Sequence, residues 1–173
     1  MTMQQHFDLV AFTDTASDFQ LYLQLVSDIE VMQMITERAI AEPEAVSDYA
    51  KLLSNNALLS GCGNFKIIDA GTQQFIGLAK LEVDHRDAAV AELGYMLLPV
   101  YWGQGIASQI AKQLIQQAQS LPQLCSLTAI IDPKHAASRK VLSKHGFESA
   151  GFEDYDGLPA EILNLSLAHE IQA

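Results

Sequence analysis

A strand-to-helix junction in the middle of the chain constrains the fold more than any other segment. Its sequence, from Leu97 to Ala107, is Leu-Leu-Pro-Val-Tyr-Trp-Gly-Gln-Gly-Ile-Ala. An apolar strand runs into an amphipathic helix through a turn that holds two glycines separated by one residue. Such a turn exposes consecutive backbone N–H groups at a helix N-terminus, where the unpaired amides and the helix dipole both favour an anion. The segment therefore predicts a phosphate site and a nucleotide-like ligand.

The elements around this junction form a strand–helix–strand unit. Apolar residues recur at helical spacing from Ile106 to Ala118, whereas the other face of this helix is polar and rich in glutamine. The helix lies between two strand-like runs, Ala89–Leu98 and Cys125–Ile131. A right-handed crossover that connects two parallel strands is the expected arrangement.

The rest of the chain predicts further strands and helices on either side of this unit. Before it, β-type runs separated by short turns indicate an antiparallel meander. After it, a second helix is expected to end at Gly146. The fold class is thus α+β, with an antiparallel half passing into a parallel pair. The other expected strands are Phe7–Phe12, Cys62–Asp69, Phe75–Val83, Glu148–Phe152 and Ile162–Leu167, and the other helical segments lie within Asp14–Ile40, Glu42–Leu59 and Lys134–His145.

Length and composition favour one globular domain over residues 1–173. The chain is 49% hydrophobic and 18% charged, which is typical of a folded soluble protein. No stretch approaches the ~20 apolar residues that span a bilayer, and Met1–His6 lacks the pattern of a signal peptide, so we expect a cytoplasmic protein with no membrane partner. Cys62 and Cys125 are isolated and are expected to be buried, reduced thiols.

The charge balance bears on the partners. With 10 basic and 21 acidic residues, the chain lacks the basic footprint that a nucleic-acid backbone requires. An acidic surface attracts cationic substrates such as amines or basic peptides, although it also serves plain solubility. No His, Cys or Asp cluster has metal-ligand spacing, so no metal is expected.

Gly94 lies inside the strand that feeds the glycine turn, where it indicates a bulge or a close backbone approach. If this strand separates from Cys125–Ile131 there, unpaired amides near Met96 to Leu98 become available. A ligand arm that carries amides can add to such an edge like a strand while its pyrophosphate rests on Gly103–Ala107. Coenzyme A has this architecture. The alternative is a tight strand-to-helix connection with no ligand.

Two segments resemble the signatures of a known family. Ala91–Leu97 followed by Tyr101–Ala107 resembles the acetyl-coenzyme-A motif of the GNAT acetyltransferases, and within them the branch of the ribosomal-protein-alanine and -serine N-acetyltransferases. Asp132–Leu142, followed by Lys144–Phe147, resembles that branch's second signature. The order and spacing agree across Val90–Phe152, whereas residues 1–60 match only in general layout. The resemblance implies a mixed sheet with a splayed parallel strand pair and helices on both faces.

The resemblance also implies the activity. A neutral primary amine, either the N-terminus of a ribosomal or other protein or a small molecule, attacks the thioester of acetyl-coenzyme A directly, with no metal and no covalent enzyme intermediate. The protein is expected to be a monomer or a homodimer. The residues expected to bind the co-substrate are Met96, Leu97, Leu98, Trp102, Gly103, Gln104, Gly105, Ile106, Ala107, Ser108, His135 and Ser138.

The chain departs from the family pattern at two positions. Trp102 stands where the phosphate loop of the superfamily usually begins with Arg or Gln, so the backbone amides hold the pyrophosphate with one charged contact fewer. His135 stands where the second signature usually has Asn. An imidazole donates or accepts one hydrogen bond, and its protonation would make the contact pH-dependent.

Two residues are candidates for the chemistry. Glu92, two residues before Gly94, can accept the proton of the amine through water, or it is a strand carboxylate that faces solvent or is bonded to a neighbour. Ser138, on the inner face of its helix, can bond the thiolate, or it bonds back to its own backbone. Tyr155 is a weaker candidate for a donor to the thiolate, because it is expected in a loop.

Two other functions compete with this interpretation. A nucleotide-dependent enzyme on a doubly wound sheet requires a third glycine after Gly105, and Ser108 stands in its place. A non-catalytic acyl-coenzyme-A-binding module of the same fold is consistent with His135 in the usual Asn position, and it predicts binding without transfer.

Overall fold

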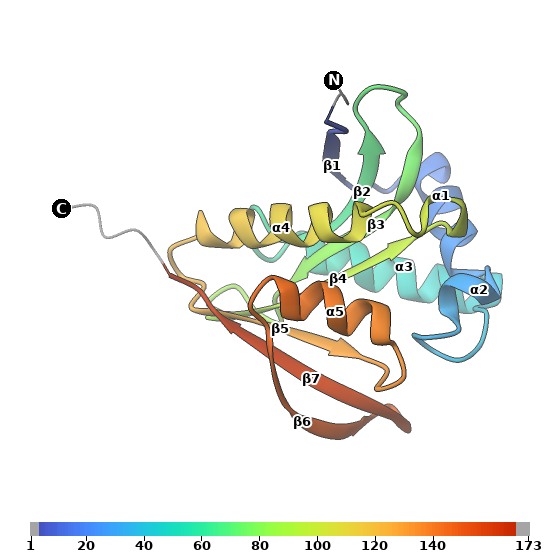
Figure 1. The fold of residues 1–173 in the computed structure, drawn as a ribbon. Coiled ribbons are helices and arrows are strands. Elements are labelled where there is room, and N and C mark those ends of the chain that lie inside the picture. The colour runs from blue at the N-terminus through green and yellow to red at the C-terminus, as the bar shows by residue number, and fades with distance from the viewer. Residues whose placement is uncertain (1–3, 169–173) are drawn as a thin grey trace.

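A computed structural model describes residues 4–168 of the chain and shows one seven-stranded sheet with helices on both faces (Figure 1). The strand order is β1-β2-β3-β4-β5-β7-β6. The strands are β1 (Phe7–Ala11), β2 (Gly63–Asp69), β3 (Phe75–Glu82), β4 (Val90–Leu97), β5 (Ser126–Ile131), β6 (Glu148–Tyr155) and β7 (Leu158–Ser166). The helices are α1 (Ala16–Val26), α2 (Ile29–Met32), α3 (Glu42–Asn56), α4 (Ile106–Gln119) and α5 (Ala136–Lys144), with a short 3-10 turn, η1 (Pro99–Tyr101).

The sheet confirms the expected α+β class. Strands β1 to β4 pair as antiparallel neighbours, and β4 pairs in parallel with β5 after the crossover through α4. The parallel pairing spans only three positions, from Val90 opposite Ser126 to Glu92 opposite Thr128. Beyond them β4 and β5 separate, and β5 continues along β7. The expected splay of the parallel pair is confirmed.

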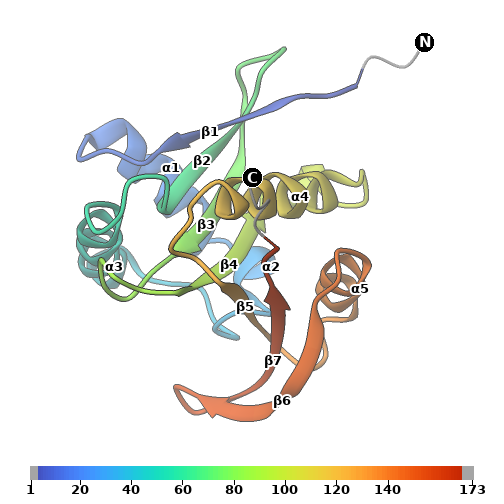
Figure 2. The same cartoon turned by 90° about the vertical axis from the view of Figure 1, so that its left-hand side faces the viewer.

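Two hydrophobic cores cover the two faces of the sheet. Ile110 and Leu114 of α4 are fully buried against one face, where they meet Leu81 and Leu93. The opposite face packs under α1, α2 and α3, whose buried residues include Tyr22, Leu25 and Tyr49. Figure 2 shows these two layers, with α4 and α5 on one side of the sheet and α1 and α3 on the other. The gap between β4 and β5 therefore lies between two layers of helices.

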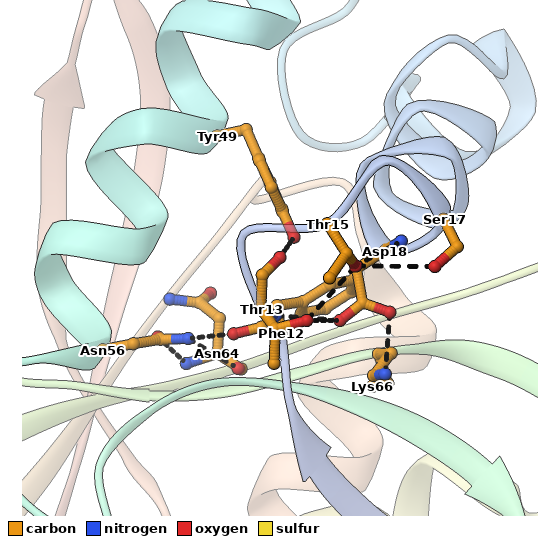
Figure 3. A network of polar contacts seen from close by, with 9 residues as sticks. All are labelled: Phe12, Thr13, Thr15, Ser17, Asp18, Tyr49, Asn56, Asn64 and Lys66. Carbon is orange, nitrogen blue, oxygen red and sulfur yellow. Dashed lines mark hydrogen bonds and ion pairs between the residues drawn. The ribbon is translucent and has the colours of Figure 1, made fainter.

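A buried polar network attaches the N-terminal helices to the sheet (Figure 3). The carboxylate of Asp18 in α1 accepts hydrogen bonds from the backbone N–H and the hydroxyl of Thr13 and from Lys66 of β2, 2.8 Å away. Burial raises the pKa of Asp18, but Lys66 and Thr13 outweigh it and leave that pKa lowered. On α3, Asn56 accepts from the backbone N–H of Asn64 in β2. The network fixes α1 and α3 on the sheet beside the gap.

The structure corrects two expectations about single residues. Cys125 is exposed rather than buried, because it lies in the turn just before β5, whereas Cys62 is buried as expected. Tyr155 is the last residue of β6 and not part of a loop. Asp156 and Gly157, both in the left-handed region, form the tight turn that leads into β7.

Within residues 4–168, no helix is long and apolar enough to cross a membrane.

Candidate active site

A cavity of about 830 Å³ occupies the gap between β4 and β5. Residues from both faces of the sheet line it: Tyr22 and Leu52 come from the layer of α1 to α3, and Ile106 and Ser138 come from α4 and α5. Leu93 to Leu97 of β4 form one wall. The splay of the parallel strands therefore creates a cavity that is open to both helical layers.

The glycine turn borders this cavity. Gly103 and Gly105 have φ angles of 73° and 77°, a region that L side chains rarely adopt, and a Cβ at either position would meet no atom within 4 Å. The first hydrogen bond of α4 runs from the N–H of Gln109 to the carbonyl of Gly105. The N–H of Gln104 closes a hydrogen-bonded turn over Trp102 and Gly103, whereas the N–H groups of residues 105–108 find no acceptor within the described part of the chain. Four consecutive donors at the start of a helix suit an anion.

The free edge of β4 differs in detail from the expectation. The N–H of Leu98 donates to the carbonyl of Ile76 at 3.0 Å, so this amide is not available to a ligand. Hydrogen bonds alternate along an antiparallel strand, so Met96 also faces β3, whereas Tyr95 and Leu97 face the gap. The carbonyl of Leu97 accepts from the indole N–H of Trp102 at 2.9 Å. The amides that face the gap are therefore those of Tyr95 and Leu97, one residue away from the expected Met96 and Leu98.

Gly94 allows an ion pair on the sheet. The pairing of β3 with β4 is continuous past Gly94, so the expected bulge is absent there. Instead the side chain of Lys80 crosses Gly94, where an added Cβ would lie 2.7 Å from the Cε of Lys80. Its ammonium group reaches the carboxylate of Glu92 at 2.8 Å. Burial lowers the pKa of Lys80, but Glu92 and Glu82 outweigh it and leave that pKa raised. Glu92 thus lines the cavity as a carboxylate bonded to a neighbour.

Ser138 lies on the buried face of α5 and also lines the cavity. Its hydroxyl oxygen accepts from the hydroxyl of Tyr95 at 3.4 Å, which connects α5 with β4 across the gap. Within residues 4–168 it makes no bond to the backbone of its own helix. Burial raises the pKa of Tyr95. Sequence reasoning missed Tyr95; the signal was an aromatic residue next to Gly94 in a strand expected to separate from its neighbour.

His135 occupies the N-cap position of α5 and faces the cavity. Its imidazole makes no hydrogen bond to any residue between positions 4 and 168. Burial lowers the pKa of His135, and Asp132 opposes this only in part. The side chain is therefore neutral at neutral pH and able to donate or accept one hydrogen bond.

The structure brings most of the expected binding residues together around the cavity. Two do not line it: Leu98, and Gln104, whose side chain turns back to the carbonyl of Val100. Ser108 lines the cavity and shares a 2.9 Å hydrogen bond with His145, which joins α4 to α5. In residues 4–168, no group of three or more His, Cys, Asp or Glu side chains is placed to hold a metal ion.

Comparison with known proteins gives consistent matches. Residues 8–148 match the family model described as an acetyltransferase (GNAT) domain. An uncharacterised N-acetyltransferase of Bacillus licheniformis, p20, is 24% identical over 149 residues, 86% of this chain and 84% of its own. Two solved structures have the same fold, each at a TM-score of 0.75. Spermidine N-acetyltransferase of Vibrio cholerae, in complex with CoA and spermine, is 15% identical, and the match covers 94% of this chain and 95% of that one. RimL, a ribosomal-protein acetyltransferase in complex with CoA, is 17% identical, and the match covers 93% of this chain and 94% of that one.

Proposed function

The chain belongs to the GNAT acetyltransferases and is an N-acetyltransferase; on that premise we propose that it binds acetyl-coenzyme A in the β4–β5 gap and transfers the acetyl group to a primary amine. The observation that carries this proposal is the row of unpaired N–H groups at residues 105–108 beside the gap. Those donors suit the pyrophosphate of the co-substrate, because charge-assisted bonds to backbone amides compensate for its lost hydration.

The co-substrate fits the rest of the gap as an added strand. The amides of its pantetheine arm pair with the edge of β4 at Tyr95 and Leu97, and its thioester points toward Ser138. His135 supplies one hydrogen bond near the same end, in place of the amide of the usual Asn. Trp102 covers the turn, since its indole is bonded to Leu97.

The reaction removes one proton from the amine and releases a thiolate, and the cavity offers a group for each. The nitrogen of a neutral amine attacks the thioester carbon, so a C–N bond forms and the C–S bond breaks. The proton of the amine passes through water to Glu92, and the departing thiolate is stabilised by the hydroxyl of Ser138. Tyr95 supports Ser138 by donating to its oxygen.

The acceptor is a protein N-terminus or a small-molecule amine. The solved structures of similar fold include enzymes of both kinds, a ribosomal-protein acetyltransferase and a spermidine acetyltransferase. The competing function is an acyl-coenzyme-A-binding module that no longer transfers, which the replacement of the usual Asn by His135 favours.

A thiol-release assay tests the proposed function. The full chain is incubated with acetyl-coenzyme A and a panel of amines and N-terminal peptides, and the acetylated products are identified by mass spectrometry. We expect free coenzyme A and acetylated amine in equal amounts. Binding of acetyl-coenzyme A without product from any amine would support the non-catalytic module instead.

A further inference from the structure

The cavity has a second polar end, under α1 and α3, which the transfer chemistry does not use. Tyr22, Asp48, Asn55 and Glu82 line it. Glu82 lies on β3 directly opposite Glu92 on β4, so this end adjoins the proposed reaction centre.

Tyr22 is 93% buried, with 7% of its surface exposed, yet its hydroxyl has no hydrogen-bond partner within residues 4–168. Tyr22 lines the cavity. Burial, together with the charges of Asp48, Glu82 and Glu44, raises the pKa of Tyr22 strongly. The side-chain oxygen of Asn55 is buried and has no donor. The unpaired hydroxyl of a buried tyrosine and a buried amide oxygen without a donor point to a ligand that forms hydrogen bonds here.

Within residues 4–168, two carboxylates at this end have no cation within ion-pair distance, although the charge of Lys80 acts on Glu82 and that of Arg38 on Asp48. Among the described residues, neither Asp48 nor Glu82 forms an ion pair, although both are partly buried. Glu82 is held in place by the side-chain amide of Asn64, 3.0 Å away, and Figure 3 shows the backbone contact that fixes Asn64 to Asn56.

The cations near this end are already occupied or exposed. Arg38 is bonded to both oxygens of Glu44, and Lys80 is paired with Glu92. Lys51 borders the cavity but is exposed to solvent. Unpaired carboxylates in a partly buried cavity are unfavourable unless a cation joins them.

We propose that this end is a subsite for a second, non-reacting ammonium group, so that the preferred acceptor is a small diamine or polyamine. The proposal rests on the proposed amine acetylation and names its substrate class. The subsite suits a non-reacting group because carboxylates stabilise the charged form, whereas the attacking nitrogen must be neutral. One ammonium group therefore binds at Asp48, Glu82 and the hydroxyl of Tyr22, while the other amine of the same molecule reaches the thioester.

A matched pair of acceptors tests the subsite. Putrescine carries two amines, and in 4-aminobutanol a hydroxyl replaces one of them. We expect kcat/KM for putrescine to exceed that for aminobutanol by about tenfold or more, since a hydrogen-bonded charge pair contributes at this level. Asp48→Asn and Glu82→Gln should each reduce this ratio severalfold. Glu82→Gln preserves the contact with Asn64, because the Gln side chain keeps a carbonyl oxygen.

One control and one further cavity variant make the result decisive. Asp87→Asn removes an exposed carboxylate outside the cavity and should leave the ratio unchanged. Tyr22→Phe removes a hydroxyl that has no protein partner, so it should fold normally and still lower the ratio. A ratio near one in the wild type, or a ratio that none of the cavity variants changes, would overturn the subsite while leaving amine acetylation intact.

A binding measurement covers the case in which no amine is acetylated. Calorimetric titration of the full chain, saturated with coenzyme A, with spermidine should show binding that Asp48→Asn weakens. Absence of transfer with this binding present would contradict the proposed function alone, and absence of binding would overturn the subsite.

Discussion

The ammonium group of Lys80 lies 2.8 Å from the carboxylate of Glu92, although the register of the two strands places Lys80 opposite Gly94 and Glu92 opposite Glu82. Lys80 reaches diagonally across the sheet because Gly94 has no side chain in its way. One glycine in the strand thus explains how Lys80 reaches the carboxylate of Glu92 in the wall of the cavity.

Glu92→Gln tests the role of this carboxylate. If Glu92 receives the proton of the amine through water, the substitution should lower kcat by about a hundredfold or more and leave the affinity for acetyl-coenzyme A unchanged. The ion pair is partly exposed, so the free energy of unfolding should fall by about 1 kcal/mol or less. Steady-state kinetics and urea unfolding measure the two effects. An unchanged kcat would leave Glu92 with the structural role alone.

Two glycines on adjacent strands, Gly77 of β3 and Gly94 of β4, should respond differently to alanine. A Cβ at Gly77 would lie 2.0 Å from the backbone oxygen of Met96, which cannot move without breaking the sheet. At Gly94 it would meet only the flexible chain of Lys80. We expect Gly77→Ala to lower the unfolding free energy by more than about 3 kcal/mol and Gly94→Ala by about 1 kcal/mol. An equal loss of unfolding free energy in the two variants would show that the side chain of Lys80 cannot move away from position 94.

Ser138→Ala tests stabilisation of the leaving thiolate. Loss of one hydrogen bond to a developing charge should lower kcat by about tenfold to a hundredfold, with little change in the dissociation constant of coenzyme A. Tyr95→Phe, which removes the donor to Ser138, should have a smaller effect. Steady-state kinetics compare the kcat values of the two variants. A larger loss of kcat in Tyr95→Phe than in Ser138→Ala would indicate that Tyr95 itself contacts the thiolate.

His135 should make folding stability depend on pH. Its folded-state pKa lies below the ordinary value of 6.5, so the unfolded chain binds the proton first as the pH falls. The contribution of the neutral side chain is therefore complete above about pH 6.5 and is lost as the pH falls through the lowered pKa. Urea unfolding across this range should show wild-type stability declining relative to His135→Asn. Parallel pH profiles of the two proteins would contradict the burial of a neutral imidazole.

The sequence was sufficient for the elements whose signals are local. The period of α4, the two glycines before it and the crossover rule together predict the β4–α4–β5 unit. Gly94 lies two residues beyond Glu92, the last position at which the two strands pair. The full length of β6 was missed, because nearly all of its residues are exposed and no apolar alternation distinguishes it from a loop.

Details that depend on register were beyond the sequence. Whether Leu98 or Leu97 presents its amide to the gap is decided by pairing with β3, which is set by distant residues. The same holds for the hydrogen bond of Tyr95 with Ser138 and for the ion pair of Lys80 with Glu92, since each joins separate elements. Residue types that suit the chemistry were recognisable, but their partners were not.

Calorimetric titration with acetyl-coenzyme A, in wild type and two glycine variants, tests the central claim most directly. Gly105 and Gly157 have nearly the same backbone conformation, with φ angles of 77° and 82°, and both have open space where a Cβ would lie. Gly105→Trp should abolish binding because the indole fills the anion site, whereas Gly157→Trp, in the turn between β6 and β7, should bind like the wild type. Equal affinity in both folded variants would contradict the placement of the co-substrate on the glycine turn.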